Sequence, residues 1–216
     1  SFTVPFNQPD ESVQLLKGAA IAGHKNDFAN NVNSGYAIFI APAFWLAREP
    51  ANIFRFKTAI NCLLFALLTF FLFLLSEFLA PNESLRYRTL AVIITALHPA
   101  HITMCGYAFA FPAFTPFFLL ACLLLVKTVE EEGWWAFAFG LCVGFLYWIH
   151  ALGAIVVVAA LMAGSLVVIR NRRPNILLLT FLATFVSLIA YKCGFMPWLN
   201  SLMARNGGVS KSYYPE

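Results

Sequence analysis

The sequence has very few charged residues. Asp, Glu, Lys and Arg make up 11% of its 216 residues, and the acids number only 10. Soluble domains carry about 25% charged residues. Hydrophobic residues reach 61%, and the mean hydropathy is +0.76. This composition excludes an ordinary soluble domain and indicates an integral membrane protein.

Other absences narrow the function classes. The formal net charge is +4, but the basic residues stand between apolar blocks and form no basic face, which excludes a nucleic-acid partner. The five cysteines show no CxxC spacing. We therefore expect buried, small hydrophobic side chains in preference to a disulfide or a metal site. Residues 1–34 also lack the basic-then-apolar pattern of a signal peptide.

Long apolar runs indicate an all-α fold, a polytopic transmembrane bundle of about six spans, since about 20 apolar residues cross a bilayer. The expected spans are 56–79, 89–104, 107–126, 134–149, 151–169 and 175–195. We expect three regions: an extracytoplasmic loop over 1–55, the bundle over 56–195, and the start of a further outer loop over 196–216.

Two short segments are expected inside the first outer loop. Residues 11–22 predict a short amphipathic helix. Residues 36–47 are apolar, but they contain Pro42 and are too few to cross a bilayer, so they predict an interfacial or re-entrant segment.

Orientation follows from the basic residues in the short connections, which favour the cytoplasmic side. They lie in three connections, 80–88, 127–133 and 170–174: Arg86, Arg88, Lys127, Arg170, Arg172 and Arg173. The opposite, outer face should then hold residues 1–55, the break at 104–106, His150 and the tail from 196. The membrane is expected to be a plasma (inner) membrane or the endoplasmic reticulum.

An acidic pair, Asp10 and Glu11, follows Pro9 near the start of this outer region. Such a pair can cap a helix, because its oxygens accept backbone N–H bonds and suit the positive helix end. Alternatively, one carboxylate is a general base that deprotonates an acceptor hydroxyl. Adjacent carboxylates point in different directions on a helix, so only one would face a given substrate.

Basic and imidazole side chains on the same expected face are candidate substrate ligands. Arg55 and Lys57 precede the first span on the outer side, where they either reach lipid phosphates or hold the phosphate of a lipid-linked substrate. His98 and His101 share a helical face, but two ligands do not make a zinc site. His150 is either an interfacial residue of an aromatic belt or a hydrogen-bond donor to a phosphate or sugar.

The order of these features resembles the GT-C superfamily of membrane glycosyltransferases, protein mannosyltransferase-like enzymes that take sugars from polyprenyl- or dolichyl-phosphate carriers. The stretches that carry the resemblance are "PDESVQLLKGAAIAG", "NSGYAIFIAPAFWL", "FRFKTAINCLLFALLTFFLFLL", "AVIITALHPAHITMCGYAF" and "FMPWLNSLMARNGG". Two elements depart from the family pattern: "AFAFPAFTP" lacks an acid after the outer proline, and "NVNSGY" replaces a His-Pro-Pro-style element.

The resemblance implies that Asp10 is the general base, supported by Glu11, and that Arg55 meets the carrier phosphate. It also implies further transmembrane helices before Ser1 and after Glu216. The expected partners are a lipid-linked sugar donor and membrane lipids. The sequence has no DxD motif, which favours chemistry without a metal or other cofactor.

A non-enzymatic membrane protein is the alternative, either part of a transporter or a structural subunit of an assembly. Transporters usually carry ionisable residues in mid-span or helices broken near the midplane. Here Glu77 lies near the end of a span, and the breaks cluster at the outer face. This distribution favours the enzyme.

Overall fold

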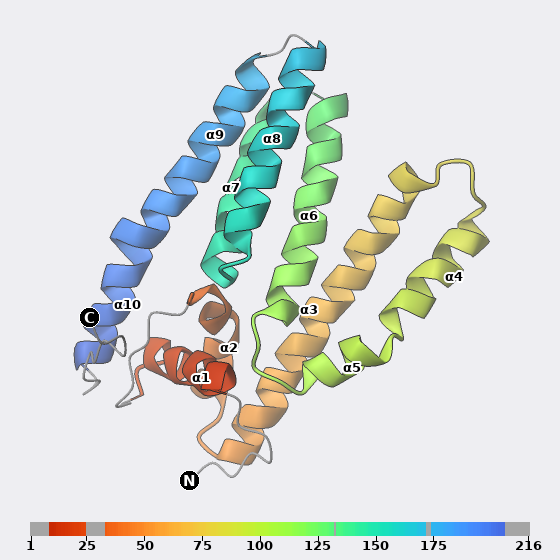
Figure 1. Ribbon diagram of the computed structural model, residues 1–216. Helices are drawn as coiled ribbons and strands as arrows, with labels where there is room; N and C mark the ends of the chain where they lie inside the picture. Colours follow the sequence, from red (N-terminus) through yellow and green to blue (C-terminus); the bar gives the residue numbers. More distant parts are fainter. Residues whose placement is uncertain (1–8, 25–32, 132, 172–173, 206–216) are drawn as a thin grey trace.

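The computed structural model describes residues 9–24, 33–131, 133–171 and 174–205. Every regular element within these ranges is a helix (Figure 1), as the all-α prediction requires. The elements are α1 (Pro9–Ile21), α2 (Gly35–Leu46), α3 (Pro50–Leu79), α4 (Leu85–Ala96), α5 (Pro99–Cys105), α6 (Phe111–Glu130), α7 (Trp134–Ile149), α8 (Gly153–Asn171), α9 (Pro174–Ile189), the π-helix η1 (Ala190–Phe195) and α10 (Met196–Arg205).

Long helices form the body of the molecule and short ones close one end of it. Figure 1 shows α6, α7, α8 and α9 running up and down beside one another, with the α3–α4 hairpin leaning away from them on the right. Helices α1 and α2 lie at the lower end, which we call the cap end. The short helix predicted over 11–22 is α1, and the segment predicted over 36–47 is the helix α2, with Pro42 inside it.

Helices α7 and α9 approach closely because small residues face each other. A Cβ atom on Gly140 would lie 2.4 Å from the Thr180 carbonyl oxygen, and one on Gly144 would lie 2.5 Å from the Ser187 Cβ. The Thr184 hydroxyl donates to the Gly140 carbonyl at 3.1 Å. Small residues at such spacing are typical of helix packing in membranes, where backbones must approach to gain contact.

Three helical segments of the described chain are long and apolar enough to cross a membrane: Pro50–Leu79, Phe111–Glu130 and Asn175–Arg205. Shorter apolar helices occupy Gly35–Leu46, Trp134–Ile149 and Gly153–Ala163. The chain is therefore suited to membrane association. The expectation of six spans holds for three of them by length and composition.

The predicted span over 89–104 is not one helix. Helix α4 ends at Ala96, and α5 begins at Pro99. His98 has φ −59° and ψ 128° between them, as expected before a proline, where the α conformation is sterically disfavoured. The sequence signal for the break is the pair His98 and Pro99.

Basic connections lie at the opposite end of the bundle, which we call the loop end. The α3–α4 and α6–α7 connections and the C-terminal end of α8 gather there, at the top of Figure 1. Arg88 lies 3.7 Å from Glu77, and Lys127 lies 2.7 Å from Glu131. Arg172 and Arg173 lie outside the described residues. Two of the three basic connections thus lie far from the cap end.

A π-helix joins α9 to α10. Its residues, Ala190–Phe195, place the Tyr191 hydroxyl 3.2 Å from the Ser34 backbone N–H, which donates to it. Beyond it, Leu199 and Met203 of α10 pack on Ala20 of α1. The predicted outer loop over 196–216 therefore begins as a helix, and its residues 206–216 lie outside the described part.

Candidate functional site

The inner face of α1 carries polar side chains that are almost completely buried. Glu11, Gln14 and Lys17 recur every three residues, a spacing that places them on neighbouring parts of one helical face. Their exposed fractions are 2%, 3% and 2%. Buried charged side chains are costly unless they are paired, so this face requires polar partners on the elements beneath it.

Glu11 pairs with a lysine on α3. Its Oε1 accepts the Ala108 backbone N–H at 2.8 Å and lies 3.9 Å from the Lys57 Nζ. Lys57 is 1% exposed. The predicted catalytic support and the predicted phosphate ligand are thus brought together, 46 positions apart in sequence, as a buried ion pair.

The ammonium of Lys57 has two further neighbours. It donates to the Gly106 carbonyl and lies 4.2 Å from the centroid of the Phe54 ring. A cation over an aromatic face is attracted by the ring quadrupole. Lys57 is therefore occupied within the protein, in contrast to the open phosphate ligand expected from the sequence.

Asn61 lies one helical turn after Lys57 on α3. It binds the same connection between α5 and α6. Its Nδ2 donates to the Cys105 carbonyl at 3.0 Å and to the Tyr107 carbonyl at 2.8 Å. Its Oδ1 accepts the Tyr36 hydroxyl at 2.8 Å. Asn61 is fully buried. These contacts tie α2 and α3 to the turn over 105–108, and we call Glu11, Tyr36, Lys57 and Asn61 the polar clamp.

Polar atoms without partners mark the α1 side of the clamp. Within the described residues, Glu11 Oε2 and Gln14 Oε1 are buried and have no hydrogen-bond partner, although Gln14 Nε2 donates to the Asn33 carbonyl at 2.9 Å. Burial lowers the pKa of Lys17 to about 8, because desolvation disfavours the charged form. Unsatisfied buried acceptors lower the stability of the fold. Stability alone therefore does not explain the polar side chains at these positions.

The two histidines at the α4–α5 break contact each other, and His98 also caps α5. His98 Nδ1 accepts the Ala100 backbone N–H at 3.2 Å, which caps α5. Its ring lies 6.0 Å from that of His101, which in turn lies 5.3 Å from the Phe65 ring. The pair is close together, as its spacing predicts.

His150 occupies the α7–α8 connection, also at the cap end. Its Nδ1 accepts the Leu152 backbone N–H at 3.0 Å. The ring stacks on Phe111 at 5.4 Å and meets Phe114 at 6.0 Å. It packs on the start of α6 and α8 and does not join the polar clamp.

Arg55 is exposed near the start of α3. Its Nη1 donates to the Asn52 Oδ1 at 3.5 Å, within one turn of the same helix. The guanidinium therefore lies outside the clamp. Asp10 is the second residue of α1, next to Glu11, and its side chain is outside the described residues.

Tyr36, Asn61 and Gln14 were missed as candidate residues. The signal for Asn61 was present, since Lys57 and Asn61 stand four apart in an otherwise apolar run and share a helical face. Tyr36 and Gln14 carry no comparable local signal. The described residues hold no group of three or more His, Cys, Asp or Glu side chains arranged for a metal ion.

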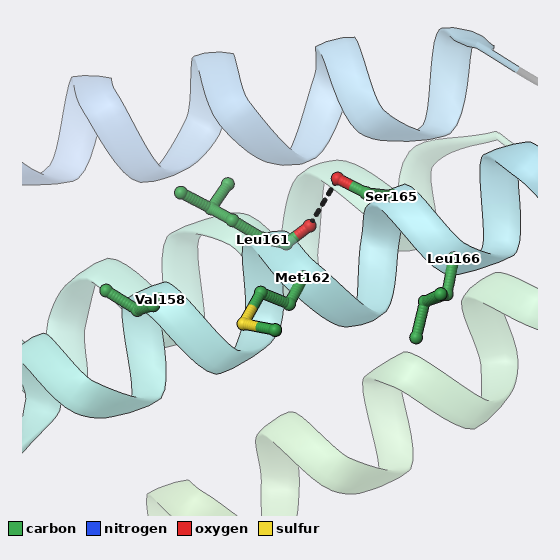
Figure 2. Close-up of a pocket in the computed structure, with 5 residues that line it drawn as sticks. All are labelled: Val158, Leu161, Met162, Ser165 and Leu166. Carbon is green, nitrogen blue, oxygen red and sulfur yellow. Dashed lines mark hydrogen bonds between the residues drawn. The ribbon is translucent and has the colours of Figure 1, made fainter.

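A surface pocket of about 410 Å³ lies elsewhere, on α8. Figure 2 shows Val158, Met162 and Leu166 along one side of the helix, with the Ser165 hydroxyl turned to its own helix and bonded to the Leu161 carbonyl at 2.8 Å. This lining is apolar and contains none of the predicted site residues. The polar clamp is therefore the better candidate site.

Comparison with known proteins adds no family to these observations. No protein-family model, no curated protein and no solved structure matches this chain.

Proposed function

We propose that this chain is a membrane glycosyltransferase that moves a sugar from a lipid-phosphate carrier to an acceptor hydroxyl at the cap end. The observation that carries the proposal is the buried Glu11–Lys57 pair. It anchors the first turn of α1, and with it Asp10, above the turn over 105–108. An acid held on a rigid element at the end of a membrane bundle suits a base that must meet a membrane-anchored donor.

Asp10 is the proposed general base, and it takes the proton of the acceptor hydroxyl as the oxygen attacks the anomeric carbon. The bond from that carbon to the phosphate oxygen breaks, and the lipid phosphate leaves with its electron pair. Glu11 supports Asp10 by fixing the helix that carries it. The proposed reaction requires no metal or other cofactor.

Arg55 is the proposed ligand of the carrier phosphate, because it is an exposed cation near the cap end of α3. A guanidinium binds phosphate oxygens through parallel N–H bonds. His98, His101 and His150 lie at connections on this end and are proposed to border the donor.

The proposed orientation places the cap end on the extracytoplasmic side. Its support is the position of Arg86 and Arg88 in the first turn of α4 and of Lys127 in the last turn of α6, beside the connections at the loop end, since basic residues favour the cytoplasm. We further propose a multi-pass chain of about six spans, in a plasma or endoplasmic reticulum membrane, completed by further helices of the full-length protein.

Sugar transfer from a polyprenyl-phosphate donor by the full-length protein in membrane vesicles tests the proposal. Asp10→Asn should lower the turnover by about 100-fold or more, the range for loss of a general base. Glu83→Gln, at an exposed position of the α3–α4 connection, is the matched control and should keep full activity. Equal turnover in the wild type and Asp10→Asn would remove the assignment of the base.

A second pair of variants tests the phosphate ligand. Arg55→Gln should raise the KM for the donor with a smaller effect on kcat, whereas Arg48→Gln, at another exposed arginine of the cap end, should change neither. Absence of transfer by the wild-type protein with any polyprenyl-phosphate sugar would favour the non-enzymatic alternative, a transporter part or a structural subunit.

A further inference from the structure

Two cysteines that are far apart in sequence meet beside the polar clamp. Cys62 lies on α3 and is exposed, and Cys105 is the last residue of α5 and is partly buried. The expectation that the cysteines are buried is therefore wrong for Cys62, and also for Cys193. It holds for Cys142, whose thiol donates to the Phe117 carbonyl at 3.3 Å.

The clamp holds the backbone at Cys105 against α3, next to Cys62. Asn61, which immediately precedes Cys62, donates to the carbonyl of Cys105 itself at 3.0 Å. Lys57, one turn earlier on α3, donates to the next carbonyl, that of Gly106. The Cys62 thiol is the side-chain neighbour of the Cys105 thiol. Two neighbouring thiols on backbones that Asn61 and Lys57 hold together are placed for a bond.

We propose that Cys62 and Cys105 form a reversible disulfide that fastens the end of α5 to α3. This proposal does not rest on the proposed sugar transfer. The neighbours favour this pair over others: Cys62 lies on the surface of the bundle, whereas Cys142 is enclosed in the contact between α6 and α7.

The oxidant is a disulfide of the low-molecular-weight thiol pool or of a thiol oxidoreductase. The Cys62 thiolate attacks one sulfur of that disulfide and releases the first thiolate, which leaves a mixed disulfide on Cys62. The Cys105 thiolate then attacks the Cys62 sulfur and releases the second thiolate. The two cysteine protons pass to the two released thiolates, so the pair loses two electrons and the oxidant gains them.

The second step should set the rate. Burial, followed by the hydrogen bond from Cys62, raises the pKa of Cys105 to about 11. Only the thiolate attacks a disulfide, so closure should be slow at neutral pH and should accelerate as the pH rises toward that value. A slow closure leaves the pair reduced unless it meets an oxidising compartment.

Intact-mass spectrometry of the full-length protein in membranes tests the proposal. The test chain is the C122A/C142A/C193A variant, which keeps Cys62 and Cys105. After exposure to glutathione disulfide at alkaline pH until the reaction is complete, and blocking with maleimide at neutral pH, the chain should have lost two hydrogens and should carry no glutathionyl group. Maleimide labelling of both thiols should fall together by at least tenfold, and dithiothreitol should restore it.

A matched chain that also carries Cys105→Ser separates closure from simple reactivity. It should stop at a glutathionyl adduct on Cys62. Fragment mapping of the wild-type chain provides a measurement that needs no variant, and it should find the linked fragments that contain Cys62 and Cys105. A stable glutathionyl adduct on Cys62 with Cys105 present, or a link that forms only after unfolding in dodecyl sulfate, would overturn the proposal.

Discussion

The α7–α9 contact and the polar clamp join helices in opposite ways. In the first, Gly140 and Gly144 leave room for the backbone of α9, and the contact depends on shape. In the second, Lys57 and Glu11 join α3 to α1 by charge, although both are almost fully buried. The bundle body is therefore held by close packing, whereas the cap depends on the protonation and pairing of a few side chains.

The largest effect is expected from removing one charge of the clamp. Lys57→Met leaves Glu11 buried without its cation, which should lower the free energy of unfolding by about 4 kcal/mol. Thermal unfolding in detergent micelles measures the loss. The double variant Lys57→Met/Glu11→Leu removes both charges and should recover most of the stability. Equal losses in the single and double variants would show that the pair is not coupled.

A side chain placed in the shape-dependent contact should have the next largest effect. Gly140→Val forces atoms into a site where a Cβ would already lie 2.4 Å from the Thr180 oxygen, at a cost of about 3 kcal/mol. Gly194→Ala is the control, because a Cβ there meets nothing within 4 Å. The same unfolding assay should show a loss for the first variant alone, at every pH tested.

Loss of the amide in the clamp should cost less. Asn61→Leu removes the donors to Cys105 and Tyr107 and the acceptor for Tyr36, which should lower stability by about 2 kcal/mol. Asn200→Leu, at an exposed helical asparagine, is the control. Comparable unfolding temperatures for the two variants would contradict the role of Asn61.

The smallest expected effect is a pH dependence of the free energy of unfolding that comes from Lys17 on α1. The pKa of Lys17 falls from 10.5 to about 8 on folding, so between these values the unfolded chain binds more protons and stability rises with pH. The gain should be about 1 kcal/mol between about pH 8 and pH 9. Lys17→Met should remove this part of the slope. An unchanged slope in that variant would assign it to another group.

The sequence predicts the helical segments better than their interruptions. Apolar runs locate α3, α6 and α9, because hydropathy over about 20 residues reports membrane burial directly. Hydropathy does not locate the break between α4 and α5 at Leu97 and His98, because Pro99 and the local backbone conformation determine it. The placement of α1 and α2 at the end opposite Arg88 and Lys127 follows from the basic connections.

The candidate site could be predicted only in part. Lys57 and Asn61 are visible as polar residues four apart in an apolar run. Their partners are not, because Glu11 and the turn at Gly106 are far away in sequence, and no local pattern reports a contact of that kind. The Glu11–Lys57 pair is therefore visible only in the fold. It shows Lys57, an expected phosphate ligand, as a cation paired inside the protein.

The π-helix at Ala190–Phe195 fixes the angular position of everything that follows it. A π turn holds about one residue more than an α turn. If the same residues formed a regular α-helix, every later residue would be advanced by one position and α10 would rotate by about 100°. Leu199 and Met203 would then swing away from Ala20, their present neighbour on α1. The extra residue in the π turn thus determines whether α10 can pack against α1.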